Sequence, residues 1–193
     1  MNYPKLDLNR YSDVCVLVVD MQKFFYRRDN WPEENIDNIK KVIGIAKEHE
    51  MPVRYLISSY AKERDSLSMI PGFEPGEGEV IEKRSGNGFS NEFYTSDLDD
   101  VLEKLDIKTL IMVGGNLCQC VYATFLGGKD KYRVVIPVDA TVCNNGKPIG
   151  NCSIMKDHNI NKGICNSPQE FRKKGGIMTD MNHFLIECQQ SLA

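Results

Sequence analysis

The sequence lacks long hydrophobic runs, since no stretch approaches the roughly 20 apolar residues that span a bilayer. Residues 1–10 are polar and include Pro4, Asp7 and Arg10, which predicts that they are no signal peptide. An excess of basic charge is also missing: the formal net charge is -3, which gives no electrostatic footprint for nucleic acid. We therefore expect a cytoplasmic protein that spans no membrane and binds no nucleic acid.

Histidine and paired cysteines are equally scarce. The three histidines (His49, His158 and His183) stand far apart, and none of the seven cysteines belongs to a CxxC pair, so a structural zinc site has little support. A chain of 193 residues is long enough to form its own core, and an odd number of cysteines favours reduced thiols over disulfides. We expect no metal and no cofactor.

Apolar runs alternate with helical patterns along the chain. The run Val14–Val19 is rich in valine, as is typical of strands buried on both faces of a parallel sheet. Apolar residues spaced by three and four predict helices over residues 36–46 and 98–105. Further strands are predicted at 53–58, 80–81, 109–113, 133–138 and 177–179. This alternation predicts a parallel sheet between helical layers, in a single domain covering residues 1–193.

Reactive residue types follow three of these apolar runs. Asp20 directly follows the first run, Lys83 follows the short run at 80–81, and Cys120 follows the run at 109–113 and a Gly pair. In an open parallel sheet, ligands bind outside the carboxyl ends of the strands. A carboxylate, an ammonium and a thiol are therefore expected at one edge of the sheet.

Cys120 is the candidate nucleophile of this group. A cysteine that opens a helix after a glycine-rich turn lies near the positive end of the helix dipole, which favours the thiolate. A nearby Lys83 ammonium is expected to lower the thiol pKa further. Because no histidine falls near these strand ends, the expected general base is the Asp20 carboxylate.

Each of these residue types also has a common structural role. An aspartate at a strand end is most often a turn or cap residue, a lysine there is usually solvated, and a cysteine in an apolar helix start is usually an inert core residue. Cys118 and Cys120 together are also compatible with a redox or metal pair. Residue spacing alone leaves these alternatives open.

Four segments, in the same order along the chain, resemble the isochorismatase-like cysteine hydrolase family. Residues 16–22 resemble the family's opening strand with its D-x-Q motif, and Lys83 followed by Phe89 resembles its lysine segment. Residues 113–124 resemble the nucleophile segment G-x-x-T-x-x-C-V-x-x-T, and residues 138–141 match the D-A-T that usually ends the next strand. Any one of these matches is weak, but their combination is specific.

The resemblance implies a three-layer α/β/α sandwich on a six-stranded parallel sheet, in a protein that is commonly a homo-oligomer. It assigns Asp20 as acid and base, Lys83 as the cation beside it, and Cys120 as nucleophile. It also implies a cis peptide bond at Gly115-Asn116, which aims the Asn116 and Cys120 amides at an oxyanion. These residues are expected to form the catalytic triad and the oxyanion hole.

The sequence departs from the family pattern in several places. Leu117 stands where the family often has Thr, and Cys118 where it often has Asp, although Val121 and Thr124 follow Cys120 at the family's offsets. The nicotinamidase branch carries an Asp/His metal cluster after the second strand, but residues 58–65 contain no histidine. This difference argues against a bound metal. Residues 90–94 form an insertion that is expected to alter the pocket wall.

The resemblance and the chemistry together predict a hydrolase that cleaves a small amide or carbamoyl C–N bond through a covalent thioester. The alternatives are a vinyl-ether hydrolase of the isochorismatase type, and a non-catalytic binding or redox module on the same scaffold. Phe25, Phe89 and Tyr122 are the expected substrate-binding residues, and the substrate is expected to be a small molecule. Residues 144–168 are expected to form a loop with one weak helix that covers a site or makes a subunit contact.

Overall fold

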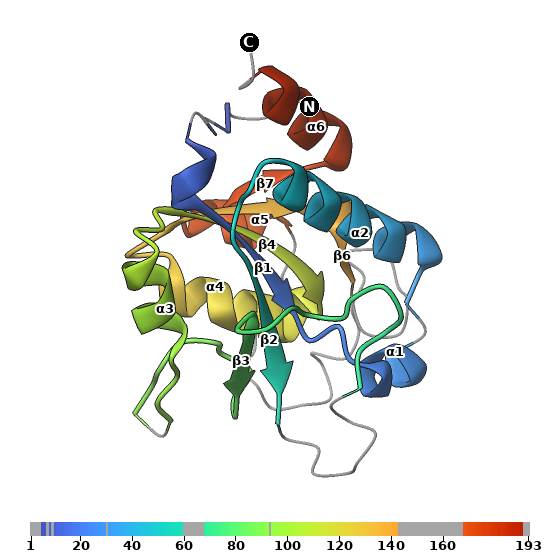
Figure 1. The fold of residues 1–193 in the computed structure, drawn as a ribbon, viewed down its shortest axis with the longest axis vertical. Coiled ribbons are helices and arrows are strands. Elements are labelled where there is room, and N and C mark those ends of the chain that lie inside the picture. The colour runs from blue at the N-terminus through green and yellow to red at the C-terminus, as the bar shows by residue number, and fades with distance from the viewer. Residues whose placement is uncertain are drawn as a thin grey trace.

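A computed structural model describes residues 5–6, 8, 10–29, 31–59, 68–92, 94–142 and 168–190 (Figure 1). The expected loop therefore lies outside the described residues, apart from Pro168. The strands are β1 (Val14–Val19), β2 (Val53–Ser58), β3 (Val80–Lys83), β4 (Thr109–Gly115), β5 (Arg133–Pro137), β6 (Thr141–Val142) and β7 (Ile177–Thr179). The α-helices are α1 (Lys23–Asp29), α2 (Glu33–Glu48), α3 (Leu98–Lys104), α4 (Tyr122–Gly128), α5 (Pro168–Lys173) and α6 (Met181–Gln190). Short helical segments η1 (Tyr11–Asp13), η2 (Leu117–Val121) and η3 (Val138–Ala140) complete the described elements.

The sheet is parallel throughout, with strand order β3-β2-β1-β4-β5-β7 and the two-residue β6 paired beside β4. The six-stranded parallel sheet is thus confirmed, with β6 as an addition. The strand order reverses between β1 and β4, because β2 and β3 lie on one side of β1 and the later strands on the other. A reversal of this kind opens a crevice at the carboxyl ends of the two strands.

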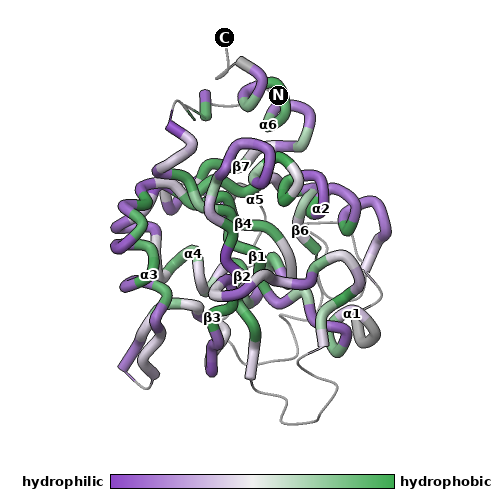
Figure 2. Tube along the Cα trace, viewed as in Figure 1, coloured by the Kyte–Doolittle hydropathy of each residue, from purple (hydrophilic) through white to green (hydrophobic). Residues whose placement is uncertain are grey.

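Alternation along the strands explains the three layers. In β1, Val14, Val16 and Val18 pack into one core cluster with α2 and α6, whereas the intervening residues pack into a second cluster with α3, α4 and α5. Successive side chains of a strand point to opposite faces, so a run that is entirely apolar requires helices on both sides. Figure 1 shows α2 and α3 on opposite sides of the sheet, and Figure 2 shows the apolar residues concentrated in the strands.

The helices also follow from the sequence pattern. In α2, apolar side chains at the expected three-and-four spacing, such as Ile36, Ile39 and Ile43, are buried against the sheet. The predicted helix near residue 98 begins at Leu98, whose backbone N–H donates to Ser96 Oγ at 3.2 Å. Ser96 therefore contributes a side-chain hydrogen bond to the first turn of α3. None of the helices in the described part of the chain is long and apolar enough to cross a membrane.

Candidate active site

Gly114, at the end of β4, allows that strand to run close beside β1. Its φ is +105°, and a Cβ at this position would lie 2.3 Å from the carbonyl oxygen of Val19. Only glycine fits such a backbone approach without strain. The peptide bond one residue further along, Gly115-Asn116, is cis, as the family resemblance implied. The chain then enters η2, which carries Cys120.

Gln22, the last residue of the D-x-Q motif, joins the ends of β1 and β2. Its Nε2 donates to Ser58 O at 3.1 Å, and its Oε1 accepts from Ser58 N at 2.8 Å. Asp20, two residues earlier, has a left-handed backbone (φ +51°) and donates its N–H to Leu56 O at 3.0 Å. The role of Gln22 was not predicted from the sequence, since an amide that bridges two strand ends leaves no local pattern.

Lys83 and Asp20 form a buried ion pair. Lys83 Nζ lies 2.9 Å from Asp20 Oδ2, and the two side chains are only 1% and 2% exposed. Lys83 Nζ also donates to the backbone oxygen of Ser85 at 3.1 Å. Register explains how these distant residues meet, because Val19 pairs with Leu56 and Ser58 pairs with Lys83 across three adjacent strands.

Cys120 completes this group. It is partly buried, and its thiol lies close enough to Asp20 and Lys83 to interact electrostatically with both side chains. The structure therefore brings together the three residues that the sequence placed at three separate strand ends. A thiol in contact with a carboxylate and an ammonium is suited to nucleophilic attack assisted by a base.

The environment raises the pKa of each of the three groups. Burial raises the pKa of Asp20 above its ordinary value, against the opposing effects of Lys83 and Cys120. Burial acts to lower the pKa of Lys83, but Asp20 and Cys120 outweigh it, so that pKa is raised. For Cys120, burial and the Asp20 carboxylate raise the pKa to about 12, against the lowering effect of Lys83. The expected low thiol pKa is thus wrong, and the resting thiol is protonated beside a carboxylate that can accept its proton.

Asn116, the expected oxyanion-hole residue, is buried and directly precedes η2. Its carbonyl oxygen accepts from Gln119 N at 3.0 Å and from Val121 N at 3.1 Å, which anchors the turn. The use of the Asn116 and Cys120 amides as oxyanion donors stays a prediction.

The expected substrate-binding aromatics lie in the two cores or at their border. Phe89 stacks on Tyr132 with ring centroids 5.7 Å apart, and Tyr122 packs edge-on against Phe171 at 5.0 Å. Phe25 is partly buried against the core cluster that contains α2. These contacts explain the burial of the rings through packing within the protein. Their contact with a substrate stays a prediction.

Asp139 and Trp31 have structural roles near the site. The Asp139 carboxylate of the D-A-T motif accepts from Met181 N at 2.9 and 3.1 Å and so caps the start of α6. Trp31 packs on the nucleophile turn, because a Cβ at Gly115 would lie 2.6 Å from its ring.

No disulfide joins the cysteines that the structure describes. These cysteines are Cys15, Cys118, Cys120 and Cys188, and Cys118 is buried. Among the residues that the structure describes, no group of three or more His, Cys, Asp or Glu side chains is arranged to hold a metal ion. Most of the segment compared with the nicotinamidase metal cluster, residues 60–65, lies outside the described ranges, as does Phe93 of the 90–94 insertion.

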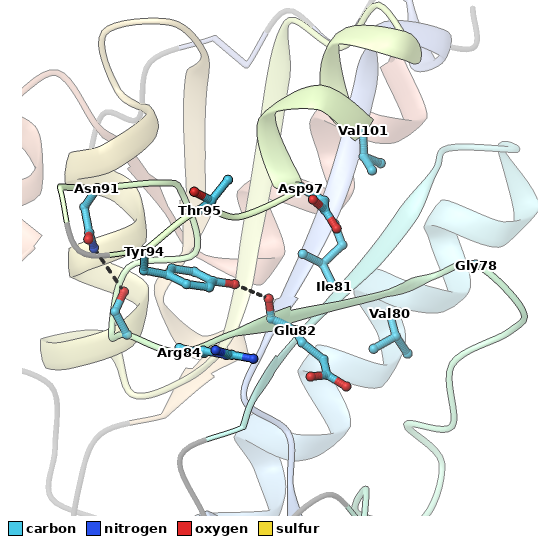
Figure 3. Close-up of a pocket in the computed structure, with 11 residues that line it drawn as sticks. Gly78, Val80, Ile81, Glu82, Arg84, Asn91, Tyr94, Thr95, Asp97 and Val101 are labelled. Carbon is cyan, nitrogen blue, oxygen red and sulfur yellow. Dashed lines mark hydrogen bonds between the residues drawn. The ribbon is translucent and has the colours of Figure 1, made fainter.

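A surface hollow of about 1120 Å³ lies beside β3, between that strand, the loop after it and α3 (Figure 3). Glu82 and Arg84, which flank Lys83, line it, and Tyr94 donates its hydroxyl to Glu82 O at 2.5 Å. Neither Asp20 nor Cys120 lines this hollow. Lys83 does not line it either, so this hollow is distinct from the group formed by Asp20, Lys83 and Cys120.

Solved structures similar to this one belong to hydrolases. A cysteine hydrolase from Pseudomonas syringae pv. phaseolicola 1448A is 19% identical with a TM-score of 0.75, covering 99% of this chain and 100% of that one. An isochorismatase from Pseudomonas putida KT2440 is 26% identical with a TM-score of 0.61, covering 72% and 74%. An N-carbamoylsarcosine amidase from Thermoplasma acidophilum is 21% identical with a TM-score of 0.65, covering 88% and 97%.

No curated protein matches the sequence significantly. The family model of the isochorismatase domain matches residues 14–147, which include the first six strands and all three residues of the buried cluster. This match covers more than half of the chain, and it agrees with the parallel fold and with the order of the four motifs. The chain belongs to the isochorismatase family of hydrolases.

Proposed function

We propose that this protein is a cysteine hydrolase that cleaves a small amide or carbamoyl C–N bond. The observation that carries the proposal is the buried Lys83–Asp20 ion pair, 2.9 Å between Nζ and Oδ2, with the Cys120 thiol beside it and in electrostatic interaction with both side chains. A carboxylate that is held in a buried site and touches a thiol is placed to act as its general base. Asp20, Lys83 and Cys120 form the proposed catalytic triad.

In the first half of the reaction, Cys120 Sγ attacks the substrate carbonyl carbon while its proton passes to Asp20. The carbonyl oxygen becomes an oxyanion that accepts hydrogen bonds from the Asn116 and Cys120 amides. When the C–N bond breaks, the amine leaves with the proton that Asp20 holds. The product of this half is a thioester on Cys120, and Asp20 is again a carboxylate.

In the second half, Asp20 takes a proton from water as that water attacks the thioester carbon. The tetrahedral intermediate collapses, the acid is released, and the Cys120 sulfur recovers a proton from Asp20. The Lys83 ammonium stays in place throughout and stabilises the negative charge as it moves between the carboxylate and the sulfur. The net reaction adds one water to one amide.

The choice of amide over vinyl-ether chemistry depends on Cys120. Covalent capture by a thiol is suited to acyl transfer, whereas hydrolysis of a vinyl ether does not require a nucleophile at this position. The amidase among the similar structures is consistent with C–N chemistry in this fold. Vinyl-ether hydrolysis is the second candidate, and a single domain, a homo-oligomer and a cytoplasmic location stay predictions.

A hydrolysis screen tests the proposed function. Carboxamides, carbamoyl acids and ureido acids are incubated with the wild type and with Cys120→Ala, and ammonia release is measured. We expect ammonia from at least one substrate class with the wild type and none above background with the variant. Hydrolysis of a vinyl ether at the same rate by both proteins, with no ammonia from any amide, would show that the second candidate is correct.

The decrease of kcat/KM at low pH should follow protonation of the Asp20 carboxylate. This carboxylate must be ionised to accept the thiol proton, and burial raises its pKa above the ordinary value of 3.8. We therefore expect kcat/KM to fall, as the pH is lowered, at a pH above the range of an exposed carboxyl group. Stopped assays with the substrate from the screen, between about pH 4 and pH 9, measure this profile. A kcat/KM that stays constant down to the ordinary carboxyl range would exclude Asp20 as the base.

A further inference from the structure

Residues 85–89, here called the lysine loop, follow Lys83 and lie directly on α4, the helix that follows Cys120. Thr124 of α4 is fully buried, and its Oγ1 accepts a hydrogen bond from Gly88 N at 2.9 Å. The same hydroxyl donates to Gly86 O at 3.4 Å. One buried hydroxyl thus satisfies a donor and an acceptor on the loop backbone.

Small residues on α4 allow this close approach. A Cβ at Gly127 would lie 2.5 Å from Asn87 Oδ1, and one at Gly128 would lie 2.6 Å from the Phe89 ring. Thr124, Gly127 and Gly128 are spaced by three and four residues, so they share one face of the helix. The loop therefore sits in a surface of α4 that has no long side chains to hold it away.

The two ends of this contact lead to two members of the proposed triad. On the loop side, Lys83 Nζ donates to Ser85 O at 3.1 Å. Ser85 Oγ in turn donates to the backbone oxygen of Asn87 at 2.8 Å and accepts from the backbone N–H of Asn87 at 3.1 Å. On the helix side, Cys120 precedes Thr124 by one helical turn. Thr124 is the point at which the lysine loop and the nucleophile segment are joined by hydrogen bonds.

We propose that Thr124 is a positioning residue, which holds the lysine loop on α4 and thereby fixes the Lys83 ammonium against the Cys120 sulfur. This inference depends on the proposed function, in which Lys83 assists the thiol. The interaction of two charges in a buried site changes steeply with their separation. A small displacement of the loop therefore weakens the effect of Lys83 on Cys120 while the fold persists.

Alkylation of Cys120 measures this effect without a substrate. Iodoacetamide reacts with the thiolate, and Lys83 favours the thiolate of Cys120, so the rate near pH 8.5 depends on Lys83. The modified Cys120 peptide is quantified by mass spectrometry, which separates it from the other cysteines. We expect Thr124→Val to slow this reaction about fivefold, the effect of one lost buried hydrogen bond. Thr124→Ser, which keeps the hydroxyl, should react as the wild type does.

A double-mutant cycle separates positioning from a general structural role. Thr124→Val is introduced into Lys83→Met, where it should have no further effect on the alkylation rate, because the residue through which it acts is gone. An equal effect with and without Lys83 would overturn the proposal, as would a wild-type rate in Thr124→Val. Thr179→Val is the matched control, since Thr179 is also fully buried and donates to a backbone oxygen, of Asp180 at 3.2 Å, but lies on β7.

Failure of this proposal is distinguishable from failure of the proposed function. If Lys83→Met alkylates at the wild-type rate, the role of Lys83 in the proposed function is wrong, and the role of Thr124 with it. If Cys120 is alkylated slowly in Lys83→Met but at the wild-type rate in a folded Thr124→Val protein, only the positioning role is wrong. Thermal unfolding establishes that each variant is folded, and Thr124→Ala replaces Thr124→Val in the same cycle if the valine variant does not fold.

Discussion

Replacing Cys120 with alanine should lower kcat for amide hydrolysis by at least about a thousandfold. The variant retains Asp20 and Lys83, but no sulfur is present to form the thioester. The pKa of the Cys120 thiol, raised to about 12, implies that the thiol loses its proton only during the attack, so the carboxylate and the sulfur act as one unit. Steady-state assays give kcat, and intact-mass measurement on rapidly quenched samples detects the acyl-enzyme in the wild type alone.

Cys118→Ala is the matched control for this experiment. Cys118 is a buried cysteine two residues away that forms no disulfide, so its replacement removes a neighbouring sulfur without changing the proposed triad. We expect it to retain activity close to that of the wild type. Equal loss in both variants, together with a reversible Cys118–Cys120 disulfide under mild oxidation, would favour the redox module over the hydrolase.

Replacing Lys83 with methionine should reduce both activity and stability, lowering the free energy of unfolding by about 3 kcal/mol at neutral pH. Asp20 is 2% exposed, and without the ammonium its carboxylate has lost its counter-charge in a buried site. Since burial already raises the pKa of Asp20, loss of the lysine raises it further. A group whose folded pKa is raised stabilises the folded state at low pH and loses that contribution as the pH rises through the folded pKa. The difference in the free energy of unfolding between the wild type and Lys83→Met should therefore become smaller as the pH is lowered.

Urea unfolding at neutral and at acidic pH measures this deficit and its sign. The double variant Asp20→Asn/Lys83→Met removes both charges and should regain much of the lost stability, because no unpaired buried charge is left. Lys131→Met is the surface control, since Lys131 pairs with Asp99 and Glu103 in solvent, and its loss should have a much smaller effect. A Lys83→Met protein as stable as the wild type at neutral pH would contradict the buried ion pair.

Most strands were predictable because they are continuous runs of apolar residues. The run Val14–Val19 is apolar at every position, and the structure buries all six residues. The strand at residue 80 is different, because only Val80 and Ile81 are apolar, yet β3 continues to Lys83. Glu82 and Lys83 belong to the strand because they pair with β2, and pairing with a partner strand leaves no mark in the local sequence.

The pKa of Cys120 also could not be predicted from local sequence. Local sequence placed Cys120 at a helix start, which predicts a low thiol pKa, but burial and the Asp20 carboxylate raise it. Desolvation depends on the layers packed around a group, and a helix dipole gives only a local and partial charge. The competing effects therefore cannot be ranked before the packing is known.

The sequence by itself determined the alternation of strands and helices, the burial of the sheet on both faces, and the placement of an acid, a lysine and a thiol at strand ends. These properties depend on apolar periodicity and on the order of segments, both of which are local. Only the tertiary structure decided that Lys83 lies 2.9 Å from Asp20, that Gln22 joins two strand ends, and that Thr124 holds the lysine loop on α4. Those contacts depend on strand register and on the close approach of backbones, and both are set only when distant segments pack together.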